Sequence, residues 1–477
     1  MRNRAWWVLT LFTSLIVFSL RPAAAGTPLH YPELSFPALP EITLPNYERY
    51  VMPNGLVVYL LENHELPLVS GTALVRTGSR WEPPEKVGLA GLTGSLIRAG
   101  GTSAHPTDEL NEALEARAAS IEAAIGTAAG SVGFSALSED LTEVLELFAE
   151  VLRTPAFDPE QLALAQVQTR GAIARRNDDP GDITSREFAK LIYGDDSPYA
   201  RTVEYETLDN IQRDDLINFH QRYFRPGQTI LGIYGDFDSP QVKSLLSQTL
   251  GDWSSSNSQV SPRIPPAEMR SKPGIYVVDQ PQLTQSNVRM GHLGGELDSP
   301  DYPALSVMNE VLNGFGGRLF NELRSRQGLA YSIFGVWSAR YDYPGVFFAG
   351  GQTRSEATVP LIAGLQKEIA RLRTKPISQE ELALAKESIL NSFVFNFDQP
   401  QEVLSRLLRY EYYGYPLDFL FQYQQQVKNT TVQDIQRVAQ KYLKPNQLIT
   451  LVVGSEEQIQ SELNELSQPV LTRAISD

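Results

Sequence analysis

The chain has 477 residues, of which 41 are Lys or Arg and 56 are Asp or Glu, and it contains no cysteine. The net charge of −15 argues against nucleic-acid binding, which requires a basic face, and the lack of cysteine excludes disulfides, thiolate metal sites and a cysteine nucleophile. Hydrophobic residues make up 42% of the sequence, which is enough apolar material for sizeable cores and excludes wholesale disorder.

The first 25 residues predict a secretory signal peptide. Two arginines precede an almost continuous apolar run from Ala5 to Leu20, and small residues follow as far as Ala25. This order of regions is typical of a cleaved signal, and the run is shorter than the roughly 20 residues that span a bilayer. We therefore expect cleavage after Ala25, no stable membrane span in the mature chain, and delivery to the periplasm or a comparable extracytoplasmic lumen.

Composition divides the remaining chain into an arm, two bodies and a linker. Residues 26–48 contain several prolines and predict an extended N-terminal arm, and residues 254–273 are rich in Ser and Pro and predict a linker. The segments 49–253 and 274–477 are then two bodies that pack with a cleft or flat interface between them.

Short strands and amphipathic helices alternate within each body. The predicted strands are Leu56–Leu61, Leu68–Arg76, Thr229–Tyr234 and Leu448–Val453, and the predicted helices are Asp108–Glu122 with Asp108 as its cap, Leu141–Leu152 and Pro159–Asn177. Strands that pair nearby and helices that are grouped between them indicate an α+β layer fold and not a doubly wound parallel sheet. We expect mainly antiparallel sheets with helices on one face.

The two bodies also repeat one another. Matching residues occur in the same order at an almost constant offset, which is the signature of an internal duplication. The matches include Arg153-Thr154 with Arg373-Thr374, Leu162–Ala165 with Leu382–Ala385, Asp178-Asp-Pro180 with Asp398-Gln-Pro400, and Gln221-Arg-Tyr223 with Gln440-Lys-Tyr442. The fold should therefore consist of two homologous α+β halves.

Three segments carry motifs that can be compared with a known family. They are Met52-Pro-Asn-Gly55 leading to His64, Gly78-Ser-Arg80 with Gly88-Leu-Ala90, and the run from Gly314 to Arg324 that continues to Tyr331. Together they resemble the pitrilysin, insulinase and mitochondrial-processing-peptidase family of inverzincin metallopeptidases, over essentially the whole mature chain. The resemblance implies two halves that close like a clamshell over a peptide.

Catalytic members of that family need His-x-x-Glu-His on a helix, because residues four apart share one face and can grip one zinc ion. The Glu between them serves as the general base. In this chain the two ligand positions are Gly91 and Ser95, the base position is Gly94, and the distal ligand position falls at Gly171-Ala172. We therefore expect no metal and no cofactor in this chain, and zinc only in a partner subunit.

The histidines offer no replacement for the missing ligands. The sequence has five, His30, His64, His105, His220 and His292, and no two of them have ligand spacing. Each is better explained as an ordinary surface or core histidine. A serine nucleophile at Ser95 is equally poor, because no histidine is placed to activate it.

Arg324 and Tyr331 are what the chain retains of the catalytic apparatus. In catalytic relatives an Arg and a Tyr at this spacing resemble a clamp on the substrate carbonyl or the developing oxyanion, and fixed donors of this kind are usually the largest catalytic term. The alternative is structural, with Arg324 paired to a neighbour such as Glu322 and Tyr331 serving in packing. Gly314, Gly316 and Gly317 precede the same segment and predict either close approach of a substrate backbone or a tight helix entry.

The function that these observations favour is a non-catalytic subunit of a heteromeric zinc metallopeptidase, inactive alone. It would lend Arg324 and Tyr331 to a composite site whose His-x-x-Glu-His is supplied by a homologous partner, in a heterodimer that acts on a peptide or unfolded polypeptide. The alternative is a non-enzymatic peptide-binding or scaffold protein of the cell envelope. A scaffold has no need of an oxyanion clamp, so the Arg–Tyr pair discriminates between the two.

Overall fold

The computed structural model describes residues 42–254, 263–314, 316–464, 466 and 468–475. The predicted signal peptide, most of the arm and the centre of the linker lie outside the described residues. The chain divides into two compact units, residues 1–43 and residues 44–477, and the second contains every described strand and helix. Among the described residues no helix has the length and apolar character needed to cross a membrane.

The first half of the repeat is built on a six-stranded sheet with the order β1-β2-β6-β3-β5-β4. All of its pairings are antiparallel except that of β2 with β6. The strands are β1 (Glu48–Val51), β2 (Val57–Glu62), β3 (Leu68–Val75), β4 (Ser120–Ile125), β5 (Gly130–Leu137) and β6 (Thr229–Gly235). The helices are α2 (Leu89–Ala99), α3 (Thr107–Glu115), α4 (Leu141–Arg153), α5 (Pro159–Ala174), α6 (Pro180–Tyr193), α7 (Tyr205–Asp209), α8 (Arg213–Tyr223) and α9 (Ser239–Leu250).

The second half repeats this plan in a sheet with the order β12-β7-β11-β8-β10-β9. Here β11 pairs in parallel with β7, as β6 does with β2 in the first half, and the short β12 adds a second parallel pairing. The strands are β7 (Gly274–Asp279), β8 (Gln285–Leu293), β9 (Ala330–Ser338), β10 (Val346–Arg354), β11 (Ile449–Gly454) and β12 (Val470–Thr472). The helices are α10 (Tyr302–Asn313), α11 (Thr358–Thr374), α12 (Gln379–Asn391), α13 (Pro400–Tyr413), α14 (Phe419–Asn429), α15 (Val432–Tyr442) and α16 (Glu456–Leu463), with the π-helical segment η6 (Phe320–Arg326) between α10 and β9.

The predicted α+β class, the duplication and the mainly antiparallel sheets are confirmed. One helix prediction is wrong in extent, because α3 ends at Glu115 and residues 120–122 already belong to β4. Ala118 adopts a positive φ of 46°, which stops the helix, and the alternating burial of Ile121 and Ile125 belongs to a strand. Asp108 lies within the first turn and is not the cap, a position that Pro106 occupies.

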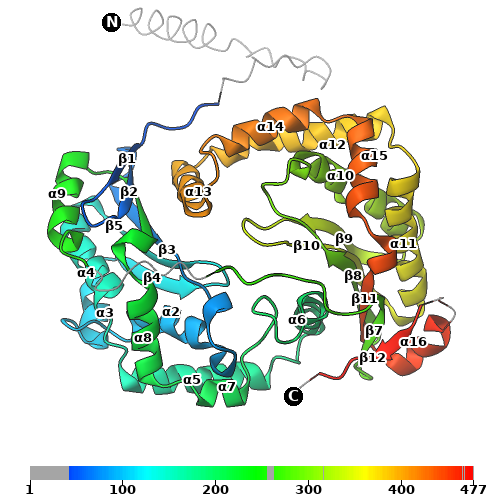
Figure 1. Ribbon diagram of the computed structural model, residues 1–477, viewed down its shortest axis with the longest axis horizontal. Helices are drawn as coiled ribbons and strands as arrows, with labels where there is room; N and C mark the ends of the chain where they lie inside the picture. Colours follow the sequence, from blue (N-terminus) through cyan, green and yellow to red (C-terminus); the bar gives the residue numbers. More distant parts are fainter. Residues whose placement is uncertain (1–41, 255–262, 315, 465, 467, 476–477) are drawn as a thin grey trace, which may run out of the picture. The chain divides into compact units, whose positions relative to one another are not determined.

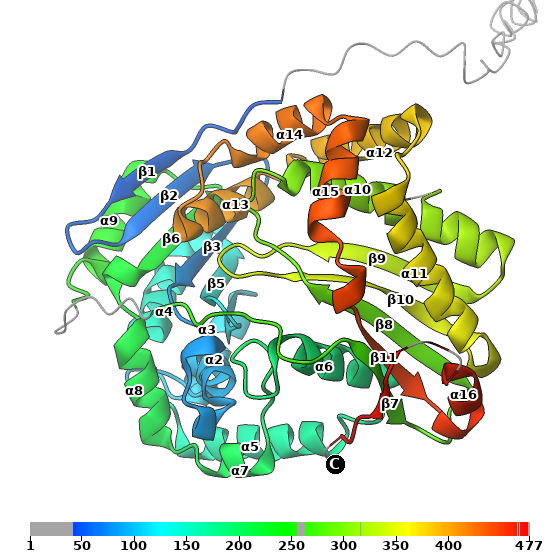
Figure 2. The same cartoon turned by 45° about the vertical axis from the view of Figure 1, so that its right-hand side comes forward.

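The two halves exchange one helix each. Helix α6 of the first half packs on β8 and β11 of the second, and α13 of the second half packs on β2, β3 and β6 of the first. Figures 1 and 2 show both helices lying against the sheet of the opposite half. The two helices occupy equivalent places in the repeat, since each begins at the proline of the Asp-x-Pro element, Pro180 or Pro400.

Apolar spacing in the two helices explains the exchange. In α13, Val403, Leu404, Leu407 and Leu408 fall three and four residues apart, so they share one face and are all buried against the first-half sheet. In α6 the corresponding face is buried against Val278, Ile449, Leu451 and Val453, and its members are Ile183, Phe188, Leu191 and Ile192. The central strands β6 and β11 are therefore buried on both faces, one by helices of their own half and one by the exchanged helix.

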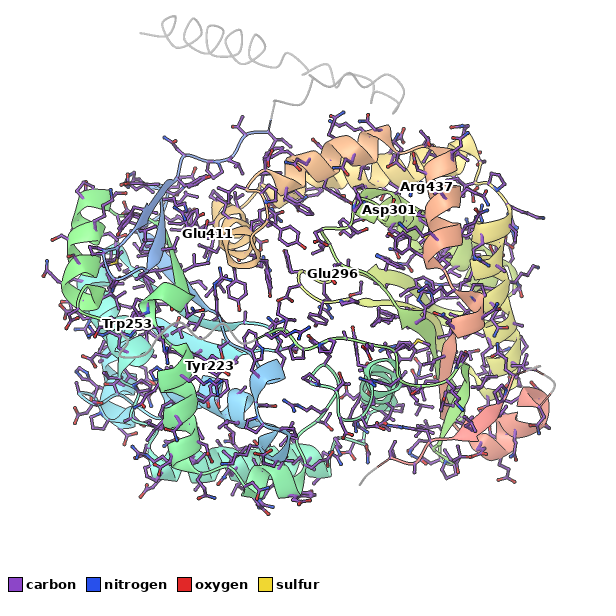
Figure 3. All side chains as sticks on the ribbon, viewed as in Figure 1. Tyr223, Trp253, Glu296, Asp301, Glu411 and Arg437 are labelled. Atoms are coloured by element: carbon purple, nitrogen blue, oxygen red, sulfur yellow. The ribbon has the colours of Figure 1, made fainter. Side chains whose placement is uncertain are left out.

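Polar contacts fix the exchanged helix α13 at its C-terminal end. Glu411, labelled in Figure 3, accepts hydrogen bonds from Arg49 at 2.8 Å and from the hydroxyl of Tyr59 at 2.8 Å. The carbonyl of Tyr412 accepts a hydrogen bond from Arg76, and the Tyr412 hydroxyl donates to the carbonyl of Ala128 at 2.6 Å. These bonds join the two halves at one end of the interface.

Candidate functional site

Helix α2 carries Gly91, Gly94 and Ser95, the positions that the family resemblance assigns to two zinc ligands and the general base. It begins after Gly88, whose φ of 106° is readily adopted only by glycine. The carboxylate of Glu82 accepts hydrogen bonds from the backbone N–H of Gly88 at 3.2 Å and of Ala90 at 2.9 Å, and it is buried. Burial raises the pKa of Glu82, while the two backbone donors lower it in part. The helix start is thus stabilised by a carboxylate that satisfies otherwise unpaired N–H groups.

Gly94 brings α2 close to the edge strand β4. A Cβ atom added at Gly94 would lie 2.5 Å from the backbone N of Ile125 and 3.0 Å from the carbonyl carbon of Ala124. Such an approach is possible only without a side chain, so a glutamate at this position would collide with β4. The base position of the family motif is therefore occupied by a glycine that the packing requires.

The other positions of the motif face open space and provide no ligand. Gly91 and Ser95 are exposed, a Cβ at Gly91 would meet nothing within 4 Å, and the Ser95 hydroxyl donates to the carbonyl of Leu92 at 3.1 Å. Gly171 and Ala172 lie on α5, which packs against α2. Within the part of the chain that the structure describes, no three His, Asp or Glu side chains are grouped to hold a metal ion. The residues at the family's zinc positions do not fit a zinc ion.

The four described histidines lie in separate environments. His64 is exposed and contacts Asp236 at 2.7 Å, and His105 contacts Glu150 at 2.7 Å. His220 and His292 are buried, and each bonds to a backbone carbonyl. Burial lowers the pKa of His220 to about 4 and that of His292 to about 4, so both are neutral core residues at pH 7. His30 lies outside the described residues.

Arg324 lies in η6 and Tyr331 is the second residue of β9, and the turn between these elements brings the two side chains together. The Cζ atom of Arg324 lies 4.9 Å from the ring centroid of Tyr331 and 4.9 Å from that of Phe320, so the guanidinium packs against both aromatic rings. The turn between them closes through the N–H of Gly328, which donates to the carbonyl of Arg324 at 3.1 Å. Tyr331 is 85% exposed. The pair is a cation–aromatic stack in which Arg324 is half-buried and the tyrosine is largely exposed.

The predicted structural alternative for Arg324 does not match its contacts. Glu322 forms ion pairs with Arg326 at 2.7 Å and with Arg371 at 3.7 Å, and not with Arg324. Among the described residues, no carboxylate lies within 4.0 Å of the Arg324 guanidinium, so Arg324 forms no ion pair there. A short π-helix often marks a functional segment, and here it sets the direction of this unpaired cation.

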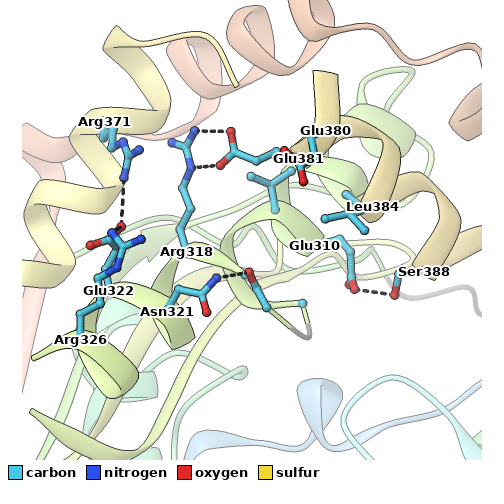
Figure 4. A pocket seen from close by; sticks show the side chains of 15 residues that line it. Glu310, Arg318, Asn321, Glu322, Arg326, Arg371, Glu380, Glu381, Leu384 and Ser388 are labelled. Carbon is cyan, nitrogen blue, oxygen red and sulfur yellow. Dashed lines mark hydrogen bonds and ion pairs between the residues drawn. The ribbon is translucent and has the colours of Figure 1, made fainter. Parts of the chain in front are cut away.

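The three predicted glycines line a different feature, a pocket of about 340 Å³ between η6 and α12 (Figure 4). Gly316 has a φ of 79°, and Gly317 packs so closely on Gly314 that a Cβ would lie 2.8 Å from its carbonyl oxygen. Neither Arg324 nor Tyr331 lines this pocket. The glycine cluster thus forms a tight turn at a pocket, on the side of η6 that does not carry the Arg–Tyr pair.

Sequence reasoning did not single out the charged residues of this pocket. Arg318 forms a two-point ion pair with Glu381, with Nε at 2.6 Å and Nη2 at 3.0 Å from the carboxylate oxygens (Figure 4). Glu310 accepts a hydrogen bond from Ser388 at 2.6 Å. The one sequence feature that could have pointed to Arg318 is its position directly after the glycines. Its partner lies 63 residues away, so the pair itself could not be read from the sequence.

A second pocket was also missed, beside the C-terminal end of α13. Its aromatic residues come from separate segments, and the signal that the sequence offered was the tyrosine-rich run from Tyr410 to Tyr415 at the end of α13. The loop between β8 and α10 supplies acidic residues to the same pocket, among them Glu296.

Comparison with known proteins was made for sequence and for fold. The family model described as "Insulinase (Peptidase family M16)" matches residues 57–193, and the model "Peptidase M16 inactive domain" matches residues 210–389. The "Uncharacterized zinc protease YmxG" of Bacillus subtilis is 24% identical over 364 residues, which are 75% of this chain and 86% of that protein. The "Non-peptidase homolog YmxG" of Helicobacter pylori is 24% identical over 408 residues, 83% of this chain and 91% of that protein.

Solved structures share the fold. The peptidase M16 inactive domain from Pseudomonas fluorescens superposes with a TM-score of 0.77 at 23% identity and covers 86% of this chain and 98% of its own. A protease from Helicobacter pylori gives a TM-score of 0.72 at 23% identity, covering 86% of this chain and 100% of its own. The periplasmic protease PqqL from Escherichia coli gives 0.73 at 15% identity, covering 90% of this chain and 49% of that one.

Proposed function

The chain belongs to peptidase family M16, as a member without the family's zinc-binding residues, and from this premise we propose that it is the non-catalytic subunit of a heteromeric zinc metallopeptidase. In this assembly a homologous chain supplies His-x-x-Glu-His, and this chain supplies Arg324 and Tyr331. The observation that carries the proposal is the contact of the Arg324 guanidinium with the rings of Phe320 and Tyr331. Among the described residues this guanidinium has no carboxylate partner, and Tyr331 is 85% exposed.

The chemistry of the pair suits the hydrolysis of a peptide bond. Attack on a peptide carbonyl places negative charge on its oxygen, and donors fixed in advance stabilise that charge without reorganisation. Arg324 offers a permanent charge with several N–H donors, and Tyr331 offers one hydroxyl. Their stacking restricts both side chains before substrate arrives, which reduces the entropy lost on binding.

The packing of α2 supports a partner as the source of the metal. Gly94 is held against β4 so closely that the general base of the family cannot stand there, and Gly91 and Ser95 provide no imidazole. A clamp for a developing oxyanion has a use only where another chain provides the attacking water. The substrate class that we propose is a peptide or unfolded polypeptide, met in the extracytoplasmic compartment to which the predicted signal peptide would direct the chain.

The test is a steady-state assay of the reconstituted pair with a dye-quenched unfolded protein as substrate. In complex with a homologous His-x-x-Glu-His chain, Arg324→Ala or Tyr331→Phe should lower turnover by roughly 10²–10³-fold, the loss seen when one oxyanion donor is removed. Arg326→Ala is the matched control, because Arg326 lies two residues further on, is exposed and pairs with Glu322. It should leave turnover within about twofold.

Gel filtration of each variant with the partner separates a catalytic role from a structural one. Unchanged turnover in both variants, with the complex intact, removes the mechanistic role and leaves the peptide-binding scaffold as the function. Loss of the complex itself shows that the Arg–Tyr stack serves assembly.

A further inference from the structure

A pocket of about 620 Å³ lies where the C-terminal end of α13 meets the loop that follows β8. It shares Ile264, Asp342 and Tyr413 with a smaller neighbouring cavity of about 210 Å³, which first-half residues such as Arg80 and Trp81 also line. Arg324, Tyr331 and the glycines that precede η6 do not line either cavity. The pocket is therefore separate from the features on which the proposed function rests, and its volume lies in the range of ligand sites.

Aromatic rings form its wall. Tyr341 stacks on Tyr413 with ring centroids 4.5 Å apart and an angle of 4° between the rings, and it meets Tyr415 edge-on at 5.4 Å. Phe419 continues this wall at 5.0 Å from Tyr415. The Tyr415 hydroxyl donates to the carbonyl of Tyr341 at 2.7 Å, which ties α13 to the β9–β10 turn. Ring faces carry partial negative charge and attract cations.

Carboxylates complete the pocket on its other side. Glu296 and Asp298 come from the loop between β8 and α10, and Figure 3 labels Glu296 near the space beside α13. Among the described residues neither carboxylate has a Lys, Arg or His partner within 4.0 Å. The neighbouring Asp342 is already paired with the buried Arg80 at 2.8 Å. Burial raises the pKa of Glu296, and the nearby charges of Asp298 and Asp342 raise it further.

These features select one kind of ligand. An anion is disfavoured by two unpaired carboxylates, and a metal ion finds no group of three ligating side chains in the part of the chain that the structure describes. An organic cation gains both from the acids and from the rings, and it relieves the repulsion between Glu296 and Asp298. The rim of the pocket is exposed and includes Gln422 and Gln426, whose amides can pair with peptide groups on either side of a bound side chain.

We propose that this pocket binds the ammonium or guanidinium side chain of a lysine or arginine within an extended polypeptide. It would make the chain selective for basic segments of its polypeptide ligand. Only the polypeptide nature of the ligand rests on the proposed function, and the pocket acts whether or not a catalytic partner is present.

The experiment measures fluorescence anisotropy of two labelled, unstructured peptides with the mature chain alone. One peptide carries four spaced lysines, and the other carries glutamine in their place. The lysine peptide should bind at least tenfold more tightly at low salt. The double variant with Glu296→Gln and Asp298→Asn should lose most of that difference, whereas Glu387→Gln, which changes an exposed acid of α12 that does not line the pocket, should keep it.

Two further measurements keep the result unambiguous. Carbodiimide cross-linking of the lysine peptide to the unmodified protein should join it at Glu296 or Asp298, and this needs no variant to fold. Cross-links confined to other carboxylates, or equal binding of both peptides, overturn the proposal. Displacement of the peptide by free arginine at the peptide's own concentration overturns the polypeptide part and assigns the pocket to a small organic cation.

The outcome is independent of the assay with the catalytic partner. Arg324→Ala should bind the lysine peptide as the unmodified chain does, because Arg324 does not line this pocket. A failure of the turnover assay with preserved lysine selectivity leaves the pocket in place, and the reverse result removes only the pocket.

Discussion

At the scale of single residues, the glycines of α2 and α5 have opposite roles. Gly94 is pressed against the backbone of β4, whereas a Cβ at Gly91 or at Gly171 would meet nothing within 4 Å. A glycine in a helix interior costs about 1 kcal/mol relative to alanine when no contact requires it. Two of these three glycines thus face open space, and the packing of α2 on β4 requires the third.

Alanine substitutions separate these roles. Gly94→Ala should lower the free energy of unfolding by about 1–3 kcal/mol, because the added methyl group forces α2 away from β4. Gly91→Ala and Gly171→Ala should raise it by up to about 1 kcal/mol each through helix propensity. Urea unfolding followed by circular dichroism measures all three. Stabilisation by Gly94→Ala would show that α2 can move away from β4 at little cost.

Two buried histidines give the chain a defined dependence on pH. In His292, Nδ1–H donates to the carbonyl of Leu293 at 2.8 Å and Nε2 accepts from the N–H of Lys444 at 3.2 Å, so protonation would break the second bond. Because burial lowers the folded-state pKa of His220 and His292 to about 4, the unfolded chain binds more protons between pH 6.5 and 4. Stability therefore falls as the pH falls through this window.

Between pH 7 and pH 5 each buried histidine should account for a loss of about 2 kcal/mol in the free energy of unfolding. Replacing His220 by glutamine should remove its share of the slope, which urea titrations at the two pH values will measure. His64→Gln is the control, because the pKa of exposed His64 is raised by its bond to Asp236 and its contribution has the opposite sign. A slope unchanged in His220→Gln would contradict the assignment.

At the scale of elements, the sequence predicted most strands and long helices but not the helix exchange. Short apolar, β-branched runs located β2, β3, β6 and β11, and spacing located α4 and α5, because these signals are local. The end of α3 was missed because a positive φ at Ala118 leaves no signal in an alanine-rich run. The exchange was missed because an apolar helix face does not indicate which of two homologous sheets it will cover.

The exchange can be tested by a cavity in α13. Leu407 is 1% exposed and belongs to the core that α13 forms with the first-half sheet. Leu407→Ala should destabilise by about 2–5 kcal/mol and should raise hydrogen exchange in β6, although β6 lies in the other half of the sequence. Ser405→Ala, on the exposed side of the same helix, should change neither. Faster exchange confined to second-half strands would contradict the packing.

For the candidate site, the sequence predicted the positions of the motif residues but not the residues that surround them. The residue identities at the positions that the family resemblance assigns to zinc could be read from the sequence, and the resemblance also singled out Arg324 and Tyr331, which the structure places in contact. The partner of Arg318 and the pocket beside α13 could not be predicted, because their residues lie far apart in the chain and meet only through tertiary packing.

At the scale of the whole molecule, the reciprocal placement of α6 and α13 makes each half an incomplete protein. Without the exchanged helix from the other half, one apolar face of β6 or of β11 would be exposed to water. We therefore expect that neither half folds stably alone. Heat or denaturant should therefore unfold residues 44–477 in one cooperative transition and not in two. Calorimetric and van't Hoff enthalpies that agree would establish this, and two resolved transitions would contradict it.

Once the chain has folded, we expect that an intact linker is no longer needed to hold the two halves together. A protease site inserted in the linker, after Ser254, should yield two fragments that remain associated through gel filtration and separate only in denaturant. The same fragments expressed apart should be insoluble, and co-expressed they should assemble. In such a molecule the two halves interact as the subunits of a permanent dimer do, although they belong to one chain. A change in the catalytic motif of one half then leaves the contacts that hold both halves together intact.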